Sequence, residues 1–319
     1  MHIADWDATQ ALLPYVELAN ELSSVIRDAQ AVAPPRLIMP LSADGALLAM
    51  PATDGTLAIT KLVTVHPHNR ARGLPSVQGE VIVMDARTGQ RLALLDGQAV
   101  TARRTAALSL LAAQRLASPQ AQRGPLLIMG AGVQGKAHLE AFTQWLPRCD
   151  VFICARTFDS AEALAHAARQ QGVNAQAVGT AADILPACGL IITATTSRQP
   201  LFDDRVHDDV FIAAVGAYTP QMAELPADLV RRASLFVDTL EGAQREAGDL
   251  IQAGVDWSQV TPLSAVLAGA KPTPGRPVIF KSVGHALWDL AAARLAIRTL
   301  AEKERPSETR SALGTPKVG

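Results

Sequence analysis

The stretch LLIMGAGVQGKAHLEAF, residues 126–142, decides the fold of this chain. An apolar run leads directly into Gly130, Gly132 and Gly135, spaced as G-x-G-x-x-G, and a helical pattern follows. In a strand–loop–helix unit the first glycine permits a tight turn and the second lets a pyrophosphate approach the backbone. The third allows the helix to pack closely on the strand. Because the helix N-terminus then faces the anion, we expect a dinucleotide site here.

Strand-like and helix-like segments alternate around this unit. Apolar runs typical of strands lie at 125–129, 151–155, 174–178, 190–195, 210–215 and 234–238. Helical patterns at 134–146 and 159–171 separate several of them. This alternation predicts a parallel, doubly wound sheet of the Rossmann type. From Phe280 we expect a loop, then a long helix, and a mobile tail over 305–319.

The first part of the chain has a different pattern. A helix is expected over 8–28. Short, partly alternating segments separated by turn residues then predict an antiparallel meander: RLIMPL, ALLAM, TLAITKLVTV, QGEVIVMDA and RLALLD. The Ala- and Leu-rich run 101–117 predicts a helix with Thr101 at its N-cap. The polar break at 118–124 predicts a domain junction.

Composition limits the possible functions. Of the 319 residues 49% are apolar and 18% are charged, which predicts a sizeable core. The net charge of -1 and the 4% of aromatic residues argue against nucleic acid as a partner. The sequence has no secretory signal and no run of 18 apolar residues, so we expect no membrane association. Three cysteines without metal-binding spacing are typical of a reduced, cytoplasmic protein.

The end of the second Rossmann strand indicates the type of cofactor. Arg156 and Thr157 follow this strand, where an NAD site usually has an acid that binds the ribose hydroxyls. An arginine can make a charge-assisted contact with a 2′-phosphate, which an acid would repel. We therefore expect NADP(H) in preference to NAD(H). The alternative is that Arg156 is a solvated surface residue and Asp159 binds the ribose.

Several cations stand out in the first part of the chain. Lys61 shares its strand face with four apolar residues, so it lies either at an edge, reaching water, or in a cleft with an anionic partner. Arg103 and Arg104 stand near the expected helix start, either by accident or to hold a carboxylate together with the helix N-terminus. Because neighbours on a helix point about 100° apart, only one of them should face a ligand. Arg36 alone would be a surface residue.

His66 and His68 flank Pro67 after the strand of Lys61. They form either a polar turn or, because histidine titrates near neutral pH, a proton relay. The His-x-His spacing has no acid close by in the sequence, so we expect no metal site.

Taken as an ordered set, the motifs of this chain resemble those of the ornithine cyclodeaminase/mu-crystallin family over nearly its whole length. The stretches that carry the resemblance are PPRLIMP, TKLVTVHPHN, GLPSVQGEVIVMDARTG, LDGQAVTARRTAALS, IMGAGVQGKAHLEAF, GAYTPQMAELP and FKSVGHALWDLAAA. The resemblance implies an α/β fold with a Rossmann domain, expected over 119–279. It also implies an α+β substrate-binding and dimerisation domain with an antiparallel sheet, expected over 1–118 and 280–319. Two subunits would join these sheets in a homodimer.

The resemblance also implies roles for single residues. Arg36, Lys61 and Arg104 match residues that hold the substrate's carboxylate, and Lys61, beside the reacting carbon, is the expected catalytic residue. Arg104 is favoured over Arg103 because the family motif reads T-x-x-R-T. Gln78 matches a position that faces the substrate. The residues expected at the cofactor are Thr105, Gly130, Gly132, Val133, Gln134, Gly135, Arg156, Thr157, Thr195, Ser282 and Gly284.

One departure from the family bears on the reaction. Ornithine cyclodeaminases have an aspartate base where this chain has Tyr218, and a phenol is a poor base at neutral pH. Tyr218 is still expected to face the substrate. The resemblance therefore implies the reductase branch, which reduces Δ1-pyrroline-2-carboxylate to L-proline and Δ1-piperideine-2-carboxylate to L-pipecolate with NADPH, and possibly with NADH at lower affinity.

Three other functions stay open at this stage. The first is ornithine cyclodeamination, and the second is an open-chain imino or amino acid dehydrogenase. The third is NADPH-dependent binding of a small molecule, as in mu-crystallin.

Overall fold

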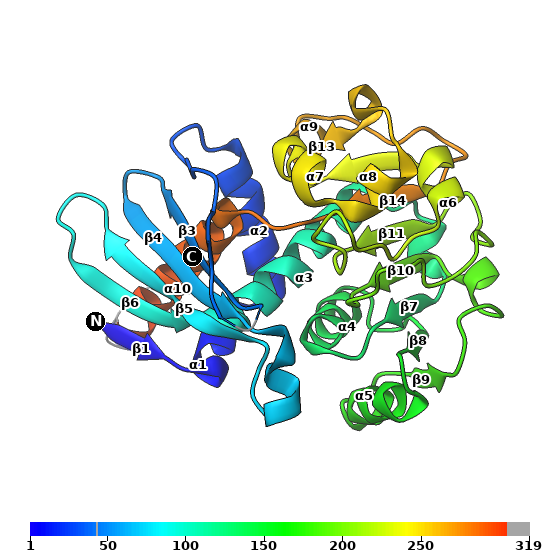
Figure 1. The fold of residues 1–319 in the computed structure, drawn as a ribbon, viewed down its shortest axis with the longest axis horizontal. Coiled ribbons are helices and arrows are strands. Elements are labelled where there is room, and N and C mark those ends of the chain that lie inside the picture. The colour runs from blue at the N-terminus through cyan, green and yellow to red at the C-terminus, as the bar shows by residue number, and fades with distance from the viewer. Residues whose placement is uncertain (43, 305–319) are drawn as a thin grey trace, which may run out of the picture.

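The computed structural model describes residues 1–42 and 44–304, so the tail expected to be mobile lies outside the described residues. It contains two separate sheets, with helix α3 (Gly97–Leu116) passing between them (Figure 1). One sheet has six strands and the other has eight. The predicted α/β class, with one antiparallel meander and one parallel Rossmann sheet, is confirmed. The division into domains at 118/119 and 279/280 stays a prediction.

The six-stranded sheet contains the predicted meander. Its strands are β1 (His2–Ala4), β2 (Leu37–Pro40), β3 (Ala46–Thr53), β4 (Leu57–Val65), β5 (Val77–Asp85) and β6 (Arg91–Asp96). They follow the order β1-β6-β5-β4-β3-β2, and every pair from β2 to β6 is antiparallel. Strand β1 pairs in parallel with β6. It was not predicted, because its 3 residues are too few to display an alternating pattern.

Two helix predictions in this region were wrong at their boundaries. The expected helix 8–28 is split at Pro14 into α1 (Trp6–Ala11) and α2 (Tyr15–Arg27), because a proline inside a helix removes a hydrogen bond and clashes with the preceding turn. Helix α3 begins before Thr101: Asp96 is its N-cap and accepts a hydrogen bond from the N–H of Ala99 at 2.7 Å. The predicted N-cap at Thr101 is therefore wrong, because Asp96 occupies the N-cap position.

The eight-stranded sheet is parallel throughout and has the order β13-β12-β14-β11-β10-β7-β8-β9. Its strands are β7 (Leu126–Met129), β8 (Val151–Cys154), β9 (Ala175–Val178), β10 (Leu190–Thr193), β11 (Phe211–Ala214), β12 (Ser234–Val237), β13 (Thr261–Pro262) and β14 (Val278–Lys281). The loop expected at Phe280 is wrong, since Phe280 and Lys281 end β14. This strand lies inside the sheet, between β12 and β11.

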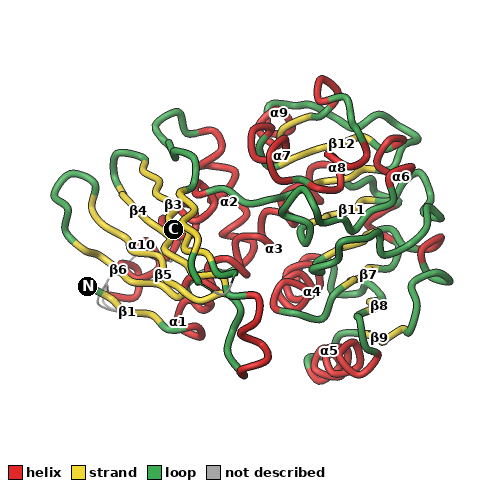
Figure 2. The backbone as a smooth tube through the Cα atoms, in the orientation of Figure 1, coloured by secondary structure: helices red, strands yellow, loops and turns green. Residues whose placement is uncertain are grey.

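The predicted helices beside the parallel sheet are present as α4 (Val133–Trp145) and α5 (Phe158–Gln170). Further along the chain lie α6 (Ala227–Arg232), α7 (Leu240–Glu246), α8 (Gly248–Ala253) and α9 (Leu263–Leu267). The long final helix is α10 (Ala286–Glu304), which returns to the six-stranded sheet and packs on β3 and β4. Figure 2 shows α10 beside the strands of that sheet.

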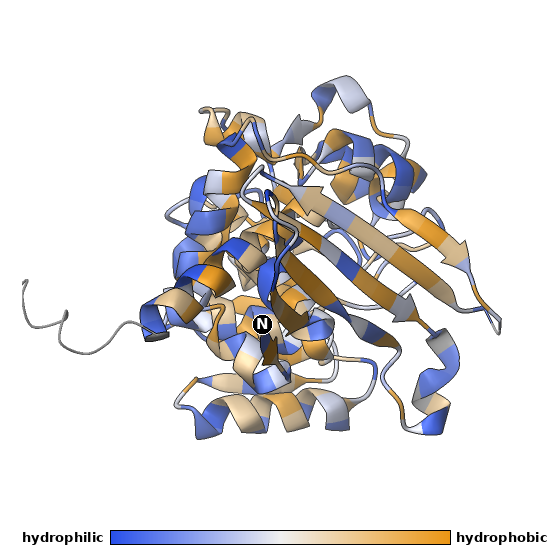
Figure 3. Ribbon diagram, turned by 90° about the vertical axis from the view of Figure 1, so that its left-hand side faces the viewer, coloured by the Kyte–Doolittle hydropathy of each residue, from blue (hydrophilic) through white to orange (hydrophobic). Residues whose placement is uncertain are grey.

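Among the described residues, helices pack on one face of the six-stranded sheet. Ile59 and Val81 are buried, on the side where α3 and α10 pack. Three apolar side chains on the opposite face are exposed by 42–65%: Leu37, Met39 and Leu62. Figure 3 looks onto this open face, and the long strands there are coloured mostly as apolar. No helix within the described part of the chain is long and apolar enough to cross a lipid bilayer.

Candidate functional site

The glycine-rich loop between β7 and α4 has room for a pyrophosphate. Gly130 has a φ of 117°, and a Cβ there would collide with the carbonyl of Ala194. A Cβ on Gly135 would collide with the carbonyl of Gly130. In front of Gly132 the space is open, and among the described residues no side chain caps α4. The backbone N–H groups at the start of α4, from the exposed Val133 onward, therefore fit the phosphates of a dinucleotide.

The end of β8 lies beside this loop, since the N–H of Gly130 donates to the carbonyl of Cys154 at 2.8 Å. Arg156 follows two residues later and is exposed, as is Asp159 in the first turn of α5. The side chain of Thr157 caps α5 by accepting from the N–H of Ser160 at 3.3 Å. Either Arg156 or Asp159 can therefore reach an adenosine ribose, and the choice between them stays a prediction.

A buried cluster of opposite charges lies where the six-stranded sheet meets α3 and α10. Lys61 in β4 is 3% exposed, and its Nζ lies 2.8 Å from Oδ2 of Asp289 in α10. Nε of Arg104, in α3, lies 3.4 Å from Oδ1 of the same carboxylate. Asp289 itself is fully buried. Of the two alternatives for Lys61, the structure therefore has the one with an anionic partner, on an interior strand.

Burial changes the protonation chemistry of Lys61. Loss of water lowers the pKa of its ammonium group to about 8, and the charge of Asp289 opposes this shift, while Arg104 and Arg36 add to it. The lysine is therefore mostly charged at neutral pH but releases its proton more readily than a solvated lysine. Such a group can hold a carboxylate and can also donate a proton.

Arg36 and Arg104 approach each other across Gly284. Nη2 of Arg36 donates to the carbonyl of Gly284 at 2.6 Å, and a Cβ on Gly284 would lie 3.0 Å from Nη2 of Arg104. Gly284 has a φ of 88°. Asp238, directly after β12, fixes this segment: its Oδ2 accepts from Oγ of Ser282 at 2.8 Å and from the N–H groups of the next two residues at 3.1 and 2.8 Å. The segment after β14 thus brings both arginines to one place.

A second buried acid, Glu224, orders the loops after β10 and β11. Its Oε1 accepts from the N–H and Oγ1 of Thr195 at 2.6 and 2.8 Å, and its Oε2 accepts from the N–H of Gly216 at 2.8 Å. Burial raises the pKa of Glu224, and the nearby charge of Lys281 opposes that shift. Lys281 is itself paired with Asp249 at 2.9 Å. Thr195 is therefore fixed at the carboxyl end of the parallel strands, where ligands bind in open α/β sheets.

Two further predicted residues, Thr105 in α3 and Gln134 in α4, donate to one carbonyl of α3. Oγ1 of Thr105 donates to the carbonyl of Thr101 at 2.7 Å, and Nε2 of Gln134 donates to the same carbonyl at 3.3 Å. Oγ1 of Thr101 also lies 3.5 Å from Nζ of Lys61. The charged cluster and the glycine-rich loop are therefore separated by a single turn of α3.

Two predicted residues lie outside the cluster. Gln78 is exposed and pairs with Thr64 across β4 and β5, so it lies on the sheet face opposite Lys61, and the structure does not bring the two together. Tyr218 is 46% exposed in the loop after β11. Their roles toward a substrate stay predictions.

The remaining candidates have other partners. Arg103 diverges from Arg104, as expected for helix neighbours: it lies 3.6 Å from Glu140 and its guanidinium lies over the ring of Tyr15 at 4.1 Å. His68 lies 3.7 Å from Asp44, and both side chains are exposed. This fits the polar turn better than a proton relay.

Sequence reasoning missed the acids of the site. Asp289 interrupts the apolar first part of α10, and Asp238 directly follows a buried strand. Both signals are present in the sequence. The sequence does not indicate the partner of Asp289, because 228 positions separate it from Lys61.

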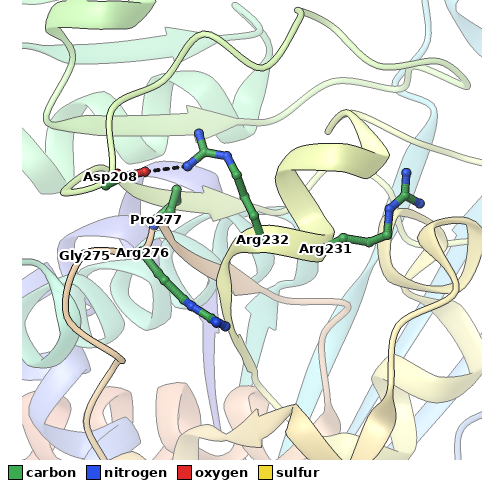
Figure 4. Close-up of a pocket in the computed structure, with 6 residues that line it drawn as sticks. All are labelled: Asp208, Arg231, Arg232, Gly275, Arg276 and Pro277. Carbon is green, nitrogen blue, oxygen red and sulfur yellow. Dashed lines mark hydrogen bonds and ion pairs between the residues drawn. The ribbon is translucent and has the colours of Figure 1, made fainter.

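A hollow beside the amino end of β14 is separate from this site (Figure 4). It is lined by Asp208, Arg231, Arg232, Gly275, Arg276 and Pro277. Arg232 is paired with Asp204 and Asp208, and Arg231 with Asp228. Because acids neutralise two of its three arginines, the hollow is a poor anion site. The described residues also contain no group of three or more His, Cys, Asp or Glu placed to hold a metal.

Comparison with known proteins shows what the whole chain is similar to. The model of the ornithine cyclodeaminase/mu-crystallin family matches residues 5–304. Δ1-pyrroline-2-carboxylate reductase 1 of Burkholderia multivorans is 43% identical, over 93% of this chain and 95% of the relative. The Δ1-pyrroline-2-carboxylate/Δ1-piperideine-2-carboxylate reductase of Azospirillum brasilense is 42% identical, over 92% and 94%. The solved structure of Thermococcus litoralis Δ1-pyrroline-2-carboxylate reductase with NADH and L-proline is 27% identical, with a TM-score of 0.86 over 95% of this chain and 98% of that one.

Replacing Asp289 by alanine should destabilise the protein by about 3–5 kcal/mol, because it leaves Lys61 and Arg104 as buried charges without a counter-ion. The measurement is urea-induced unfolding at pH 7, with exposed Asp159→Asn as a control that should change the free energy of unfolding by less than about 0.5 kcal/mol. A loss below about 1 kcal/mol for Asp289→Ala would mean that Asp289 does not hold the cluster together.

Proposed function

The chain belongs to the ornithine cyclodeaminase/mu-crystallin family, and we propose that it uses NADPH to reduce cyclic ketimines that carry a carboxylate on the imine carbon. The substrates we propose are Δ1-pyrroline-2-carboxylate, giving L-proline, and Δ1-piperideine-2-carboxylate, giving L-pipecolate. The observation that carries the proposal is the set of three cations, Lys61, Arg104 and Arg36, gathered around Gly284 and Asp289 next to the dinucleotide loop.

The residues of this set would act on different parts of the substrate. Arg36 and Arg104 would hold the carboxylate from two sides, since a guanidinium matches its geometry. Lys61 would keep the carboxylate side of the reacting carbon positive and would supply a proton to the amine nitrogen after hydride addition. A bound nicotinamide supplies the hydride, and the chain supplies orientation and charge. Tyr218 lacks the basicity that cyclodeamination of ornithine would need, so we favour reduction.

The choice of NADPH over NADH rests on Arg156. This residue is exposed at the end of β8, beside the glycine-rich loop, where a cation would attract the 2′-phosphate of the adenosine ribose. The Thermococcus relative was solved with NADH, so the nucleotide preference within such proteins has to be measured for each chain.

We also propose that the working molecule is a homodimer. The exposed side chains of Leu37, Met39 and Leu62 lie on a sheet face on which no helix of the described residues packs. An exposed patch of this kind marks an association surface. A second copy would cover it sheet against sheet, on the side of Gln78.

The proposed reaction is tested by following NADPH oxidation with each of the two cyclic imines, and with NADH in parallel. We expect turnover with both imines and a preference for NADPH. Arg156→Asp should raise the KM for NADPH by about 10–100-fold, as expected for one charge-assisted contact, and should leave the KM for NADH within about threefold. No turnover by protein that binds NADPH would rule out the reductase proposal. An unchanged KM for NADPH in Arg156→Asp would rule out the role of Arg156 alone.

The pH dependence of kcat/KM should report the state of Lys61. Its charged form is the active one, so activity should be constant below the pKa of about 8 and fall about tenfold per pH unit above it. Asp289 raises this pKa, so Asp289→Asn should move the decline to lower pH. Lys61→Arg keeps its charge throughout and should lose this decline, whatever its residual rate. A decline that is unchanged in Lys61→Arg would belong to the substrate instead.

Light scattering tests the dimer. The wild-type protein should have twice the 33.6 kDa of one chain, and Leu62→Glu on the open face should be monomeric, because it buries an unpaired charge in the interface. Val16→Glu changes an exposed apolar residue of α2 and should leave the dimer intact. A wild-type monomer at micromolar concentration would contradict the proposal.

A further inference from the structure

Glu246, the last residue of α7, lies beside the carboxylate-binding arginines and has no role in the proposed function so far. Its Oε2 lies 3.4 Å from Nη2 of Arg36. The side chain is 22% exposed, but Oε2 itself is buried and makes no hydrogen bond among the described residues. Helix α7 follows β12 on the side of the strands' carboxyl ends, where ligands bind in such sheets.

Asp289 and Asp238 have closer partners than Glu246 has. Asp289 is shared by Lys61 and Arg104. Asp238 accepts hydrogen bonds through both oxygens, because its Oδ1 takes the N–H of Thr239 while its Oδ2 holds the segment around Gly284. Glu246 has only the long ion pair with Arg36. It is therefore the acid of this cluster with an oxygen free for a ligand.

Leaving Oε2 of Glu246 without a hydrogen-bond donor is energetically unfavourable. Burial raises the pKa of the Glu246 carboxyl, the charge of Arg36 opposes the rise, and the charge of Asp238 adds to it. A buried carboxylate without a hydrogen bond is stabilised by any cation that can donate one. The carbonyl of Gly284 already satisfies part of the Arg36 guanidinium at 2.6 Å, so Arg36 can turn its remaining donors to a substrate carboxylate.

We propose that Glu246 binds the protonated nitrogen of the substrate while Arg36 and Arg104 bind its carboxylate. The inference rests on the proposed function and deepens it. In a cyclic imino acid the nitrogen and the carboxylate are attached to the same carbon, so an acid that touches one of the carboxylate-binding arginines is within reach of that nitrogen. Glu246 would thus select imino and amino acids over carboxylates that carry a neutral oxygen in the same place.

A simpler role for Glu246 would be to hold Arg36 in place, and the two roles differ in a measurable way. If Glu246 only positions Arg36, its loss should weaken every carboxylate ligand to the same extent. If it binds the cationic nitrogen, the loss should weaken only ligands that have one. L-proline and tetrahydrofuran-2-carboxylate are the matched probes, since they share the five-membered ring and carboxylate and differ in the ring NH2+ or oxygen.

The experiment is calorimetric titration of both probes into NADPH-saturated protein, in which neither probe is turned over. Wild-type protein should bind L-proline at least tenfold more tightly than the oxygen analogue. Glu246→Gln should lose at least tenfold in affinity for L-proline and less than twofold for the analogue, and Glu246→Asp should recover part of the difference. Glu241→Gln is the control, because Glu241 is exposed on the same helix and paired with Arg245, and it should change neither affinity.

Each other result contradicts the inference. Equal weakening of both probes in Glu246→Gln would assign Glu246 to holding Arg36, and no weakening of either would remove it from the site. If Glu246→Gln does not fold, equal affinity of Glu246→Asp or of the wild type for the two probes would also overturn the inference. A wild type that reduces both imines while Glu246→Gln fails the test leaves the proposed function standing. If the wild-type protein neither reduces an imine nor binds L-proline, both the proposed function and the proposed role of Glu246 are wrong.

Discussion

One buried carboxylate, that of Asp289, holds the substrate half of the site together. It ties β4, α3 and α10 to one point, since Lys61, Arg104 and Asp289 come from those three elements. Taking each of these ions out of water costs several kcal/mol, which only close pairing can offset. One acid between two bases leaves an excess of positive charge. The excess is fixed in position before any ligand arrives, and electrostatic preorganisation of this kind is effective in catalysis.

Buried acids also fix the loops at the carboxyl ends of the parallel strands. Asp238 and Glu224 are buried acids whose oxygens accept backbone N–H groups of loops, those around Gly284 and around Thr195 and Gly216. Loops are ordinarily the most mobile parts of a fold. Here the loops after β10, β11 and β14 are each bonded to a buried carboxylate, which holds them in place without a ligand.

The parts of this fold that the sequence predicted are those written in local patterns. The glycine spacing after an apolar run identified the β7–α4 loop, and alternation identified β3 to β6. Local patterns did not predict the elements whose position depends on contacts between residues far apart in the sequence. Strand β14 is only four residues long, and its place between β12 and β11 depends on a pairing that no local pattern contains. Thr101 was taken for a cap because the apolar run begins there, although Asp96 lies close before it.

The candidate site divides in the same way. Lys61 was visible as a charge on an apolar strand face, and Arg104 as one of two cations at a helix start. Their common partner was not visible, because only folding brings residue 289 to residue 61. Glu246 carries no signal of its own, as it is one of two acids on a short, polar helix.

The position of β14 and α10 also bears on how the chain is completed during synthesis. The parallel sheet has a gap between β12 and β11 until residues 278–281 have left the ribosome. The six-stranded sheet lacks α10 over β3 and β4 until residues 286–304 have followed. Domains usually fold in the order in which they are made, but here the six-stranded sheet, whose strands are made first, is the last to be covered. Until β14 has been made, the nascent chain therefore carries two unfinished apolar surfaces at once, and the face that α10 covers stays open longest.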